Sequence, residues 1–90
     1  MFKILEELIA TIRQRKVSQT GESYTYQLLN NKKLSVEKVK EEMSELIDAI
    51  EKNTNKIHEA ADVLYHLMVF LEANDIKIEN IMEELKKRQK

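Results

Sequence analysis

The sequence predicts an all-α protein, a small bundle of four to five helices that forms a single domain over residues 1–90 and completes its core by dimerisation. Three observations predict this. The chain has one glycine and no proline, and its turn-forming residues are nearly confined to a few Asn, Ser and Asp clusters, which favours helices over a sheet. Apolar residues recur at helical spacing. Ninety residues suit one domain but bury a modest fraction of their surface, so a dimer is expected.

An apolar repeat and a capping residue place the first two helices. Residues 17–22 contain the only glycine and are expected to form a loop. Ser23 is the expected N-cap of a short second helix, which ends near residues 30–31 because asparagine tolerates a left-handed conformation. A first helix over about residues 2–16 is predicted by apolar residues spaced three or four apart: Leu5, Leu8, Ile9 and Ile12.

Longer apolar patterns predict three further helices. Ser35 is expected to begin the third, which stops at residues 53–55, and the same segment is expected to cap the fourth. The fourth, over about residues 56–73, is apolar nearly all round, as is typical of a helix buried by its neighbours. A last helix is predicted over about residues 78–89. The positions expected to face the core are Val36, Val39, Met43, Leu46, Ile47, Ile50, Met68, Ile81, Met82 and Leu85.

Composition excludes several classes of protein. Fifteen basic and sixteen acidic residues are interspersed, so there is no global basic field and no nucleic-acid partner is expected. The absence of cysteine excludes disulfides and thiolate metal sites and fits a cytoplasmic location. Residues 1–7 lack the uninterrupted apolar core of a signal peptide. The longest apolar stretch, residues 63–71, is too short to cross a bilayer, so no membrane association is expected.

Four carboxylates form two pairs, each spaced i, i+3. Glu42 and Glu45 lie in the third predicted helix, and Glu59 and Asp62 lie in the fourth. Residues three apart share a helix face, so two antiparallel helices would point all four groups at one small volume. Such a cluster is costly unless a cation lies within it, and Mg²⁺ is the expected occupant because it prefers oxygen ligands. The pattern indicates a small metal-dependent enzyme acting on phosphates.

Each pair also has an explanation that needs no metal. Glu42 and Glu45 could belong to a solvated charged face, which is usual for glutamate on a surface helix. The N-terminal end of a helix stabilises acids by about 0.3–1 kcal/mol, which would account for one of Glu59 and Asp62. Structural ion pairs could also hold them. Acids on an apolar central helix are rarely buried without a partner, so the fourth helix favours the metal site.

Four other polar residues accompany these acids. His66 could be a ligand or a base, but a lone histidine on an apolar helix is more often a hydrogen-bonded packing residue, and Tyr65 has the same two interpretations. Asp48 and His58 are expected on the solvated surface, His58 because it lies beside the turn between two helices.

The motifs resemble two nested families. The pattern Glu41-Glu42-x-x-Glu45, thirteen residues, then Glu59-x-x-Asp62 resembles the metal motif of the all-α MazG-like nucleoside triphosphate pyrophosphohydrolases. Across the whole chain the sequence is similar to the phosphoribosyl-ATP pyrophosphohydrolases of histidine biosynthesis. The matching segments are Arg15-Lys16, Ser23-Tyr24-Thr25, Lys38-Val39-x-Glu41-Glu42, the run from Glu59 to Leu67, and Leu85-Lys86-Lys87-Arg88. The chain departs from the family at Lys40, where glycine is common, and has no glycine after the second helix.

The resemblance implies a function. The expected reaction is Mg²⁺-dependent hydrolysis of 1-(5-phosphoribosyl)-ATP between its α and β phosphates, giving 1-(5-phosphoribosyl)-AMP and pyrophosphate, by a helical homodimer. The implied residues are Glu42, Glu45, Glu59 and Asp62 as metal ligands, Glu41, Glu42 and Glu45 as catalytic residues, and Arg15, Lys16, Ser23, Tyr24, Lys38 and Arg88 as substrate contacts.

Several of these roles keep alternatives. Glu41 could take the proton of the attacking water or hold a second metal ion. Ser23 could contact phosphate or only cap a helix, and Tyr24 could stack on the base or only pack. The same centre could serve a house-cleaning MazG-like pyrophosphatase acting on ordinary or damaged nucleotides. A non-catalytic helical interaction module would account for the helices, but not for acids on a buried helix.

Overall fold

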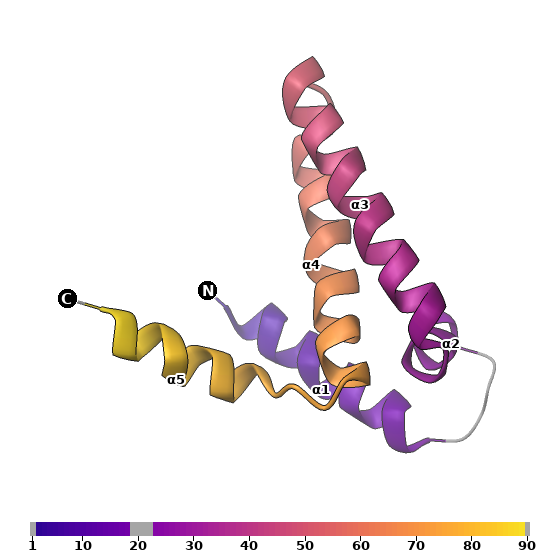
Figure 1. Ribbon diagram of the computed structural model, residues 1–90, viewed down its shortest axis with the longest axis vertical. Helices are drawn as coiled ribbons and strands as arrows, with labels where there is room; N and C mark the ends of the chain where they lie inside the picture. Colours follow the sequence, from indigo (N-terminus) through magenta and orange to yellow (C-terminus); the bar gives the residue numbers. More distant parts are fainter. Residues whose placement is uncertain (1, 19–22, 90) are drawn as a thin grey trace.

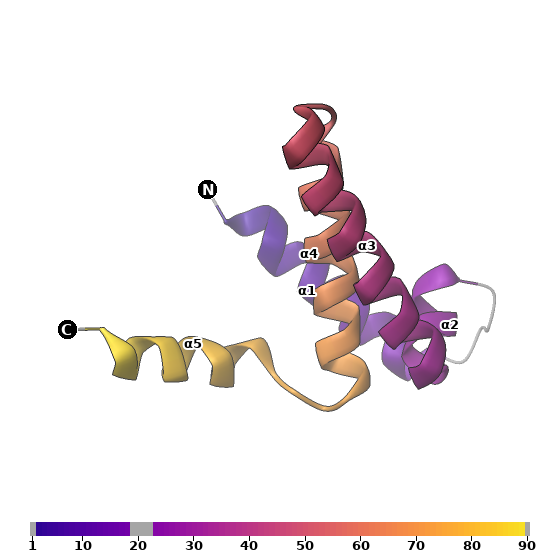
Figure 2. The same cartoon turned by 45° about the horizontal axis from the view of Figure 1, so that its top comes forward.

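The computed structural model describes residues 2–18 and 23–89, and these residues form five helices with no strand among them. Figures 1 and 2 show a long antiparallel pair of helices, α3 and α4, with α1 crossing one end of it and α5 projecting to the side. The prediction of an all-α fold is confirmed. The helices are α1 (Lys3–Val17), α2 (Tyr24–Asn30), α3 (Lys32–Lys52), α4 (Lys56–Ala73) and α5 (Ile78–Arg88).

Helices α3 and α4 form a hairpin with a tight asparagine turn. Asn53 and Asn55 adopt left-handed backbone angles, with φ of 57° and 43°. Asparagine tolerates this region of backbone angles better than most residues, which explains why the chain turns here between the two helices. The backbone N–H of Thr54 donates to the carbonyl of Ala49 and closes the end of α3. Asn55 occupies the N-cap position of α4, but its side chain makes no capping hydrogen bond.

The start of α3 differs from the prediction. Asn31, not Ser35, is the N-cap: its side-chain oxygen accepts the backbone N–H of Leu34 at 3.1 Å. Asparagine caps as well as serine, so the helix begins at the first competent residue. Asn31 is extended rather than left-handed, and it ends α2 and begins α3 without a glycine. The predicted cap of α2 is confirmed, because Ser23 Oγ accepts the N–H of Tyr26 at 3.1 Å.

The hydrophobic core lies where α1 and α2 pack against the C-terminal half of α4. Ile12, Leu28 and Val69, one from each helix, are almost completely buried. Full burial of side chains of this size contributes about 1.5–3 kcal/mol each. Residues 19–22 of the expected loop lie outside the described residues. The buried apolar cluster consists of Ile9, Ile12, Leu28, Leu29, Met68, Val69 and Ala73.

Several residues predicted to face the core are exposed in the single chain. Met43, Ile47 and Ile50 of α3 are roughly half exposed, as are Met82 and Leu85 of α5. The prediction was wrong for these five, because periodicity shows which residues share a face but not which face meets a neighbour. Helix α4 is likewise not covered all round: two of its large apolar side chains are exposed. Those two are Ile57 and Leu64.

The face of α3 that does meet α4 is mixed. Ser35 and Ala49 are buried, and Val39, Glu42 and Leu46 are half-buried between them along the same side of the helix. Small residues at the two ends of this row let the helix backbones approach closely. Glu42 therefore points at α4 and does not belong to a solvated charged face.

An ion-pair network fixes α5 against the rest of the chain. Arg13 of α1 donates from Nε to Glu72 at 3.0 Å and from both terminal nitrogens to Glu79 at 2.6 and 2.9 Å. This bidentate contact lowers the pKa of Glu79 to about 2. Lys16 donates to the carbonyl of Glu72 and to the carboxylate of Asp75, at 2.6 and 2.7 Å. The end of α1 therefore holds the α4–α5 connection.

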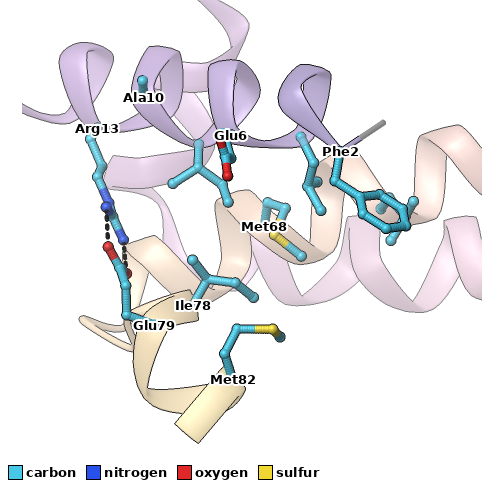
Figure 3. A pocket seen from close by; sticks show the side chains of 11 residues that line it. Phe2, Glu6, Ala10, Arg13, Met68, Ile78, Glu79 and Met82 are labelled. Atoms are coloured by element: carbon cyan, nitrogen blue, oxygen red, sulfur yellow. Dashed lines mark hydrogen bonds and ion pairs between the residues drawn. The ribbon is translucent and has the colours of Figure 1, made fainter.

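Beside this network lies an apolar groove of about 730 Å³ between α1, α4 and α5. Figure 3 shows the pair of Arg13 and Glu79 at one end, with Phe2, Met68 and Met82 along the walls.

None of the five helices described is both long and apolar enough to cross a membrane.

Loss of the buried member of the network should destabilise the fold. Glu72 is only 8% exposed, so Glu72→Ala leaves Arg13 and Lys16 without their buried partner and should lower the free energy of unfolding by about 1–3 kcal/mol. Glu79 is exposed, so Glu79→Ala should cost less, about 0.2–1 kcal/mol. Urea unfolding measures both, with Glu83→Ala on the exposed face of α5 as the control. Equal losses in all three variants would contradict this ranking.

Candidate metal centre

The α3–α4 hairpin brings the acidic pairs together. The antiparallel packing of α3 and α4 sets the two pairs opposite each other across the hairpin. One carboxylate oxygen from each of Glu42, Glu45 and Glu59 lies within 4.8 Å of the others. Asp62 is one turn after Glu59, and its charge acts on both Glu42 and Glu59. The four predicted ligands therefore share one location between two helices.

Two carboxylate oxygens in this cluster lack a hydrogen-bond donor within residues 2–18 and 23–89. Glu42 Oε2 and Glu59 Oε2 are buried and accept no hydrogen bond from any residue described. Leaving a buried acceptor unsatisfied costs about 1–3 kcal/mol, and more for a charged group. Both groups also have raised pKa values, caused first by burial and then by the charge of Glu45. Without a bound cation, the cluster therefore carries an excess of negative charge.

The chemistry of the donor set fits a hard divalent cation. All four candidate ligands are carboxylates, and such oxygen ligands suit Mg²⁺, which also keeps several waters. A cation between the helices would satisfy the two buried oxygens and offset the mutual repulsion of the acids. Glu45 is more exposed than Glu42 and Glu59, so one side of the cluster is open to solvent.

A hydrogen-bonded chain of aromatic residues borders the acids. The Nδ1–H of His66 donates to the carbonyl of Asp62 at 2.9 Å, and its Nε2 shares a hydrogen bond of 3.0 Å with the hydroxyl of Tyr24. His66 is buried, so the hydrogen-bonded packing role is the one that the structure shows. Tyr65 exchanges a short hydrogen bond with Thr25. The ring of Tyr24 stacks on Tyr65 with centroids 6.4 Å apart, and burial raises its pKa.

Of the predicted substrate contacts, three lie close to this centre. Tyr24 adjoins His66, and Ser23 is the residue before it, with its hydroxyl engaged in capping α2. Lys38 lies one turn before Glu42 on α3 and pairs with Glu41 at 3.2 Å, which raises the pKa of Lys38. Glu41 is exposed and points toward Lys38 at the edge of the cluster. A short cationic and aromatic border therefore flanks the carboxylates.

The other predicted contacts lie elsewhere in the single chain. Lys16 forms ion pairs with Glu72 and Asp75, and Arg15 is exposed in the last turn of α1. Arg88 pairs with Glu84 at 3.1 Å near the end of α5, which projects away from the α3–α4 hairpin (Figure 1). The exposed position predicted for Asp48 is confirmed, and it pairs with Lys52.

Sequence reasoning missed the network of Arg13, Glu72, Asp75 and Glu79. The signal available was Arg13 directly after Ile12 in the apolar stripe of α1, and Glu72 at the apolar end of α4. Nothing in the spacing joins the two, because they are 59 residues apart.

Comparison with known proteins decides the family. Residues 5–89 match the family model described as phosphoribosyl-ATP pyrophosphohydrolase. The chain belongs to this family. A phosphoribosyl-ATP pyrophosphatase from Methanocella arvoryzae is 41% identical over 95 residues, covering the whole of both chains. One from Methanococcoides burtonii is 40% identical, covering 96% of this chain and 92% of its own.

The phosphoribosyl-ATP pyrophosphohydrolase match also extends to a fused protein. The histidine biosynthesis bifunctional protein HisIE of Pyrococcus furiosus is 41% identical over 97% of this chain and 42% of its own length. The family predicted from the motifs is confirmed, and with it the prediction of a hydrolase over that of a non-catalytic helical module.

The crowded acids predict the pH dependence of the metal-free protein. A carboxyl whose pKa is raised by folding binds its proton more tightly when folded, so its contribution to stability is complete below the unfolded pKa near 4.5 and is lost as the pH rises through the folded pKa. Glu42→Gln stays uncharged and should lose less stability as the pH rises above about 4.5.

Urea unfolding in EDTA at several pH values measures this difference, and Glu51→Gln on the exposed side of α3 is the control. Superimposable stability profiles for Glu42→Gln and the unsubstituted protein would show that Glu42 is not crowded by the other acids.

Proposed function

We propose that the protein hydrolyses 1-(5-phosphoribosyl)-ATP between its α and β phosphates, releasing 1-(5-phosphoribosyl)-AMP and pyrophosphate in histidine biosynthesis, with Mg²⁺ as its cofactor and the cytoplasm as its location. The observation that carries the proposal is the convergence of Glu42, Glu45 and Glu59 across α3 and α4, with Asp62 one turn beyond Glu59 and two buried oxygens that find no hydrogen-bond partner among the described residues. Membership of the family supports the choice of 1-(5-phosphoribosyl)-ATP as the substrate.

The proposed roles divide between the two helices. Glu42, Glu45, Glu59 and Asp62 would hold Mg²⁺, which when bound lowers the pKa of a water and neutralises phosphate charge. We assign Glu41, which is exposed beside these ligands on α3, the role of accepting the proton of the attacking water. As Glu41 becomes neutral, its partner Lys38 would be released to stabilise the negative charge that develops on the attacked phosphate.

Three of the proposed substrate contacts lie in the cationic and aromatic border that flanks the carboxylates. Lys38 is the proposed phosphate contact nearest the acids, and Ser23 and Tyr24 lie at the start of α2 beside His66. Tyr24 is 44% exposed, so the rest of its ring surface is free for a base. Arg15, Lys16 and Arg88 remain proposed contacts; a second chain could bring Arg88 near the centre.

A homodimer is part of the proposal because an apolar face is uncovered. On α3 this face consists of Met43, Ile47 and Ile50, each roughly half exposed, and on α4 of Ile57 and Leu64. Large exposed apolar side chains that recur at helical spacing on two packed helices are typical of an interface rather than of a monomer surface. A second copy of the same hairpin would complete a four-helix arrangement around α3 and α4.

Removing a proposed ligand should abolish turnover. Glu42→Gln and Asp62→Asn should each lower kcat for 1-(5-phosphoribosyl)-ATP by about 10²–10³-fold, since each deletes a charge that holds the phosphate-neutralising ion. Asp48→Asn changes an exposed acid of the same helix and should leave kcat within about twofold, the small effect of an exposed ion pair. Pyrophosphate release at saturating Mg²⁺ measures both.

The same assay with dUTP and dCTP separates the two substrate classes. Faster hydrolysis of those nucleotides than of 1-(5-phosphoribosyl)-ATP would replace the proposed substrate with ordinary nucleoside triphosphates. Full activity in both ligand variants would remove the acidic centre from the mechanism.

A charge on the apolar face should separate the subunits. Light scattering should give the unsubstituted protein twice its chain mass of 10.6 kDa. Ile47→Glu and Leu64→Glu would bury a charge at the interface and should shift the mass to one chain. Lys33→Glu, an exposed polar position early in α3, should remain a dimer. A single-chain mass for the unsubstituted protein at high concentration would contradict the homodimer.

A further inference from the structure

A buried histidine joins the acidic centre to the start of α2. His66 lies one turn after Asp62 on α4 and is only 8% exposed. Its Nδ1–H donates to the backbone carbonyl of Asp62 at 2.9 Å, and its Nε2 shares a hydrogen bond of 3.0 Å with the hydroxyl of Tyr24, 42 residues earlier in the chain. One imidazole therefore connects the backbone of a proposed metal ligand with the side chain of a proposed substrate contact.

The ring of Tyr24 is held from two sides although 44% of the residue is exposed. Its hydroxyl is hydrogen-bonded to His66, and its ring stacks on that of Tyr65 with an angle of 19° between the two planes. Tyr65 is in turn hydrogen-bonded to Thr25, the next residue of α2. An exposed side chain ordinarily keeps much of its rotamer freedom, so these contacts order Tyr24 before any ligand binds.

The ordered ring lies at the border of the carboxylates. Lys38 and Glu42 of α3 are close enough to act electrostatically on the hydroxyl of Tyr24, and His66 acts in the same way on Glu42. An aromatic ring stacks on a nucleotide base in a defined orientation. The orientation of Tyr24 therefore affects how a base is received beside the acids, and the hydrogen bond with His66 is one of the contacts that set it.

We propose that His66 is a positioning residue for substrate binding: it fixes the ring of Tyr24 so that the base of the substrate stacks on it while the phosphates reach the acidic centre. This rests on the proposed function for the identity of the substrate, and His66 acts through Tyr24 rather than as a metal ligand or a base. The competing explanation is packing alone, in which His66 only satisfies its own ring nitrogens and joins α2 to α4.

Separate measurement of KM and kcat distinguishes the two explanations. Tyr24→Phe keeps the ring but not the hydroxyl, and His66→Leu is an apolar side chain that cannot bond to it. Each should raise KM for 1-(5-phosphoribosyl)-ATP by about two- to tenfold, the contribution of one hydrogen bond, because fewer molecules hold the ring in place. A purely structural loss leaves fewer folded molecules, which lowers the measured kcat but not KM. Unchanged KM in both variants would overturn the proposal.

The double variant tests whether His66 acts through Tyr24. Adding His66→Leu to Tyr24→Phe should raise KM no further, because the hydrogen bond is already absent. Independent, additive increases would contradict the positioning role. Tyr26→Phe removes a hydroxyl from the same helix and is the matched control, since residues two apart on a helix do not share a face, and its KM should be unchanged.

Binding of the product provides a measurement without catalysis. Titration of 1-(5-phosphoribosyl)-AMP in saturating Mg²⁺ should shift the NMR ring resonances of Tyr24, which is one of three tyrosines in the chain and can be assigned from Tyr24→Phe. The Kd should be about two- to tenfold higher in His66→Leu. Product binding that leaves the Tyr24 resonances in place, or an equal Kd in both proteins, would refute the positioning role.

Failure here is separable from failure of the proposed function. If KM and Kd do not respond to His66→Leu while Glu42→Gln abolishes hydrolysis, the positioning role is refuted and the proposed function stands. If dUTP and dCTP prove the faster substrates, but Tyr24→Phe and His66→Leu raise their KM without additivity, the positioning role stands and the proposed substrate is refuted.

Discussion

The packing of α3 against α4 is the constraint on which the rest of the structure depends, because it presses like charges into one contact. Two unit charges about 4 Å apart at a partly shielded site repel by about 4 kcal/mol. Three carboxylate oxygens lie within 4.8 Å of one another here, with Asp62 alongside. Proteins rarely hold such a cluster unless a cation balances it. The raised pKa values of Glu42 and Glu59 and their unsatisfied oxygens are consequences of that single contact.

The fold tolerates this cost because stability comes from elsewhere along the same helix. The C-terminal half of α4 carries the core, where Val69 and Met68 pack with Ile12 and Leu28 from α1 and α2. The N-terminal half carries the acids and few buried side chains. Arg13 binds Glu72 at the core end and keeps the α4–α5 connection in place. One helix therefore serves two purposes, and its two ends can be altered separately.

Sequence alone predicted most helix limits and the acidic pairs, because both depend on local spacing. The asparagines at 53 and 55 predicted the turn, and the i, i+3 spacing predicted that each acidic pair shares one helix face. The sequence could not predict which face of each helix packs against which other helix. Ile47 belongs to a genuine apolar stripe, yet α3 turns Glu42 toward α4 and leaves Ile47 exposed. The pairing of Arg13 with Glu79, 66 residues away, depends on packing that no local pattern records.

Thermal unfolding against Mg²⁺ concentration tests the central claim most directly, with Na⁺ at matched ionic strength as the reference. A ligand that binds only the folded protein stabilises it by about 2.7 kcal/mol at 100 times its Kd. The Tm of the unsubstituted protein should rise with Mg²⁺, and that of a Glu42→Gln, Glu59→Gln double variant should not, since both buried oxygens then lack charge. Identical rises in both proteins, or none in either, would contradict the account.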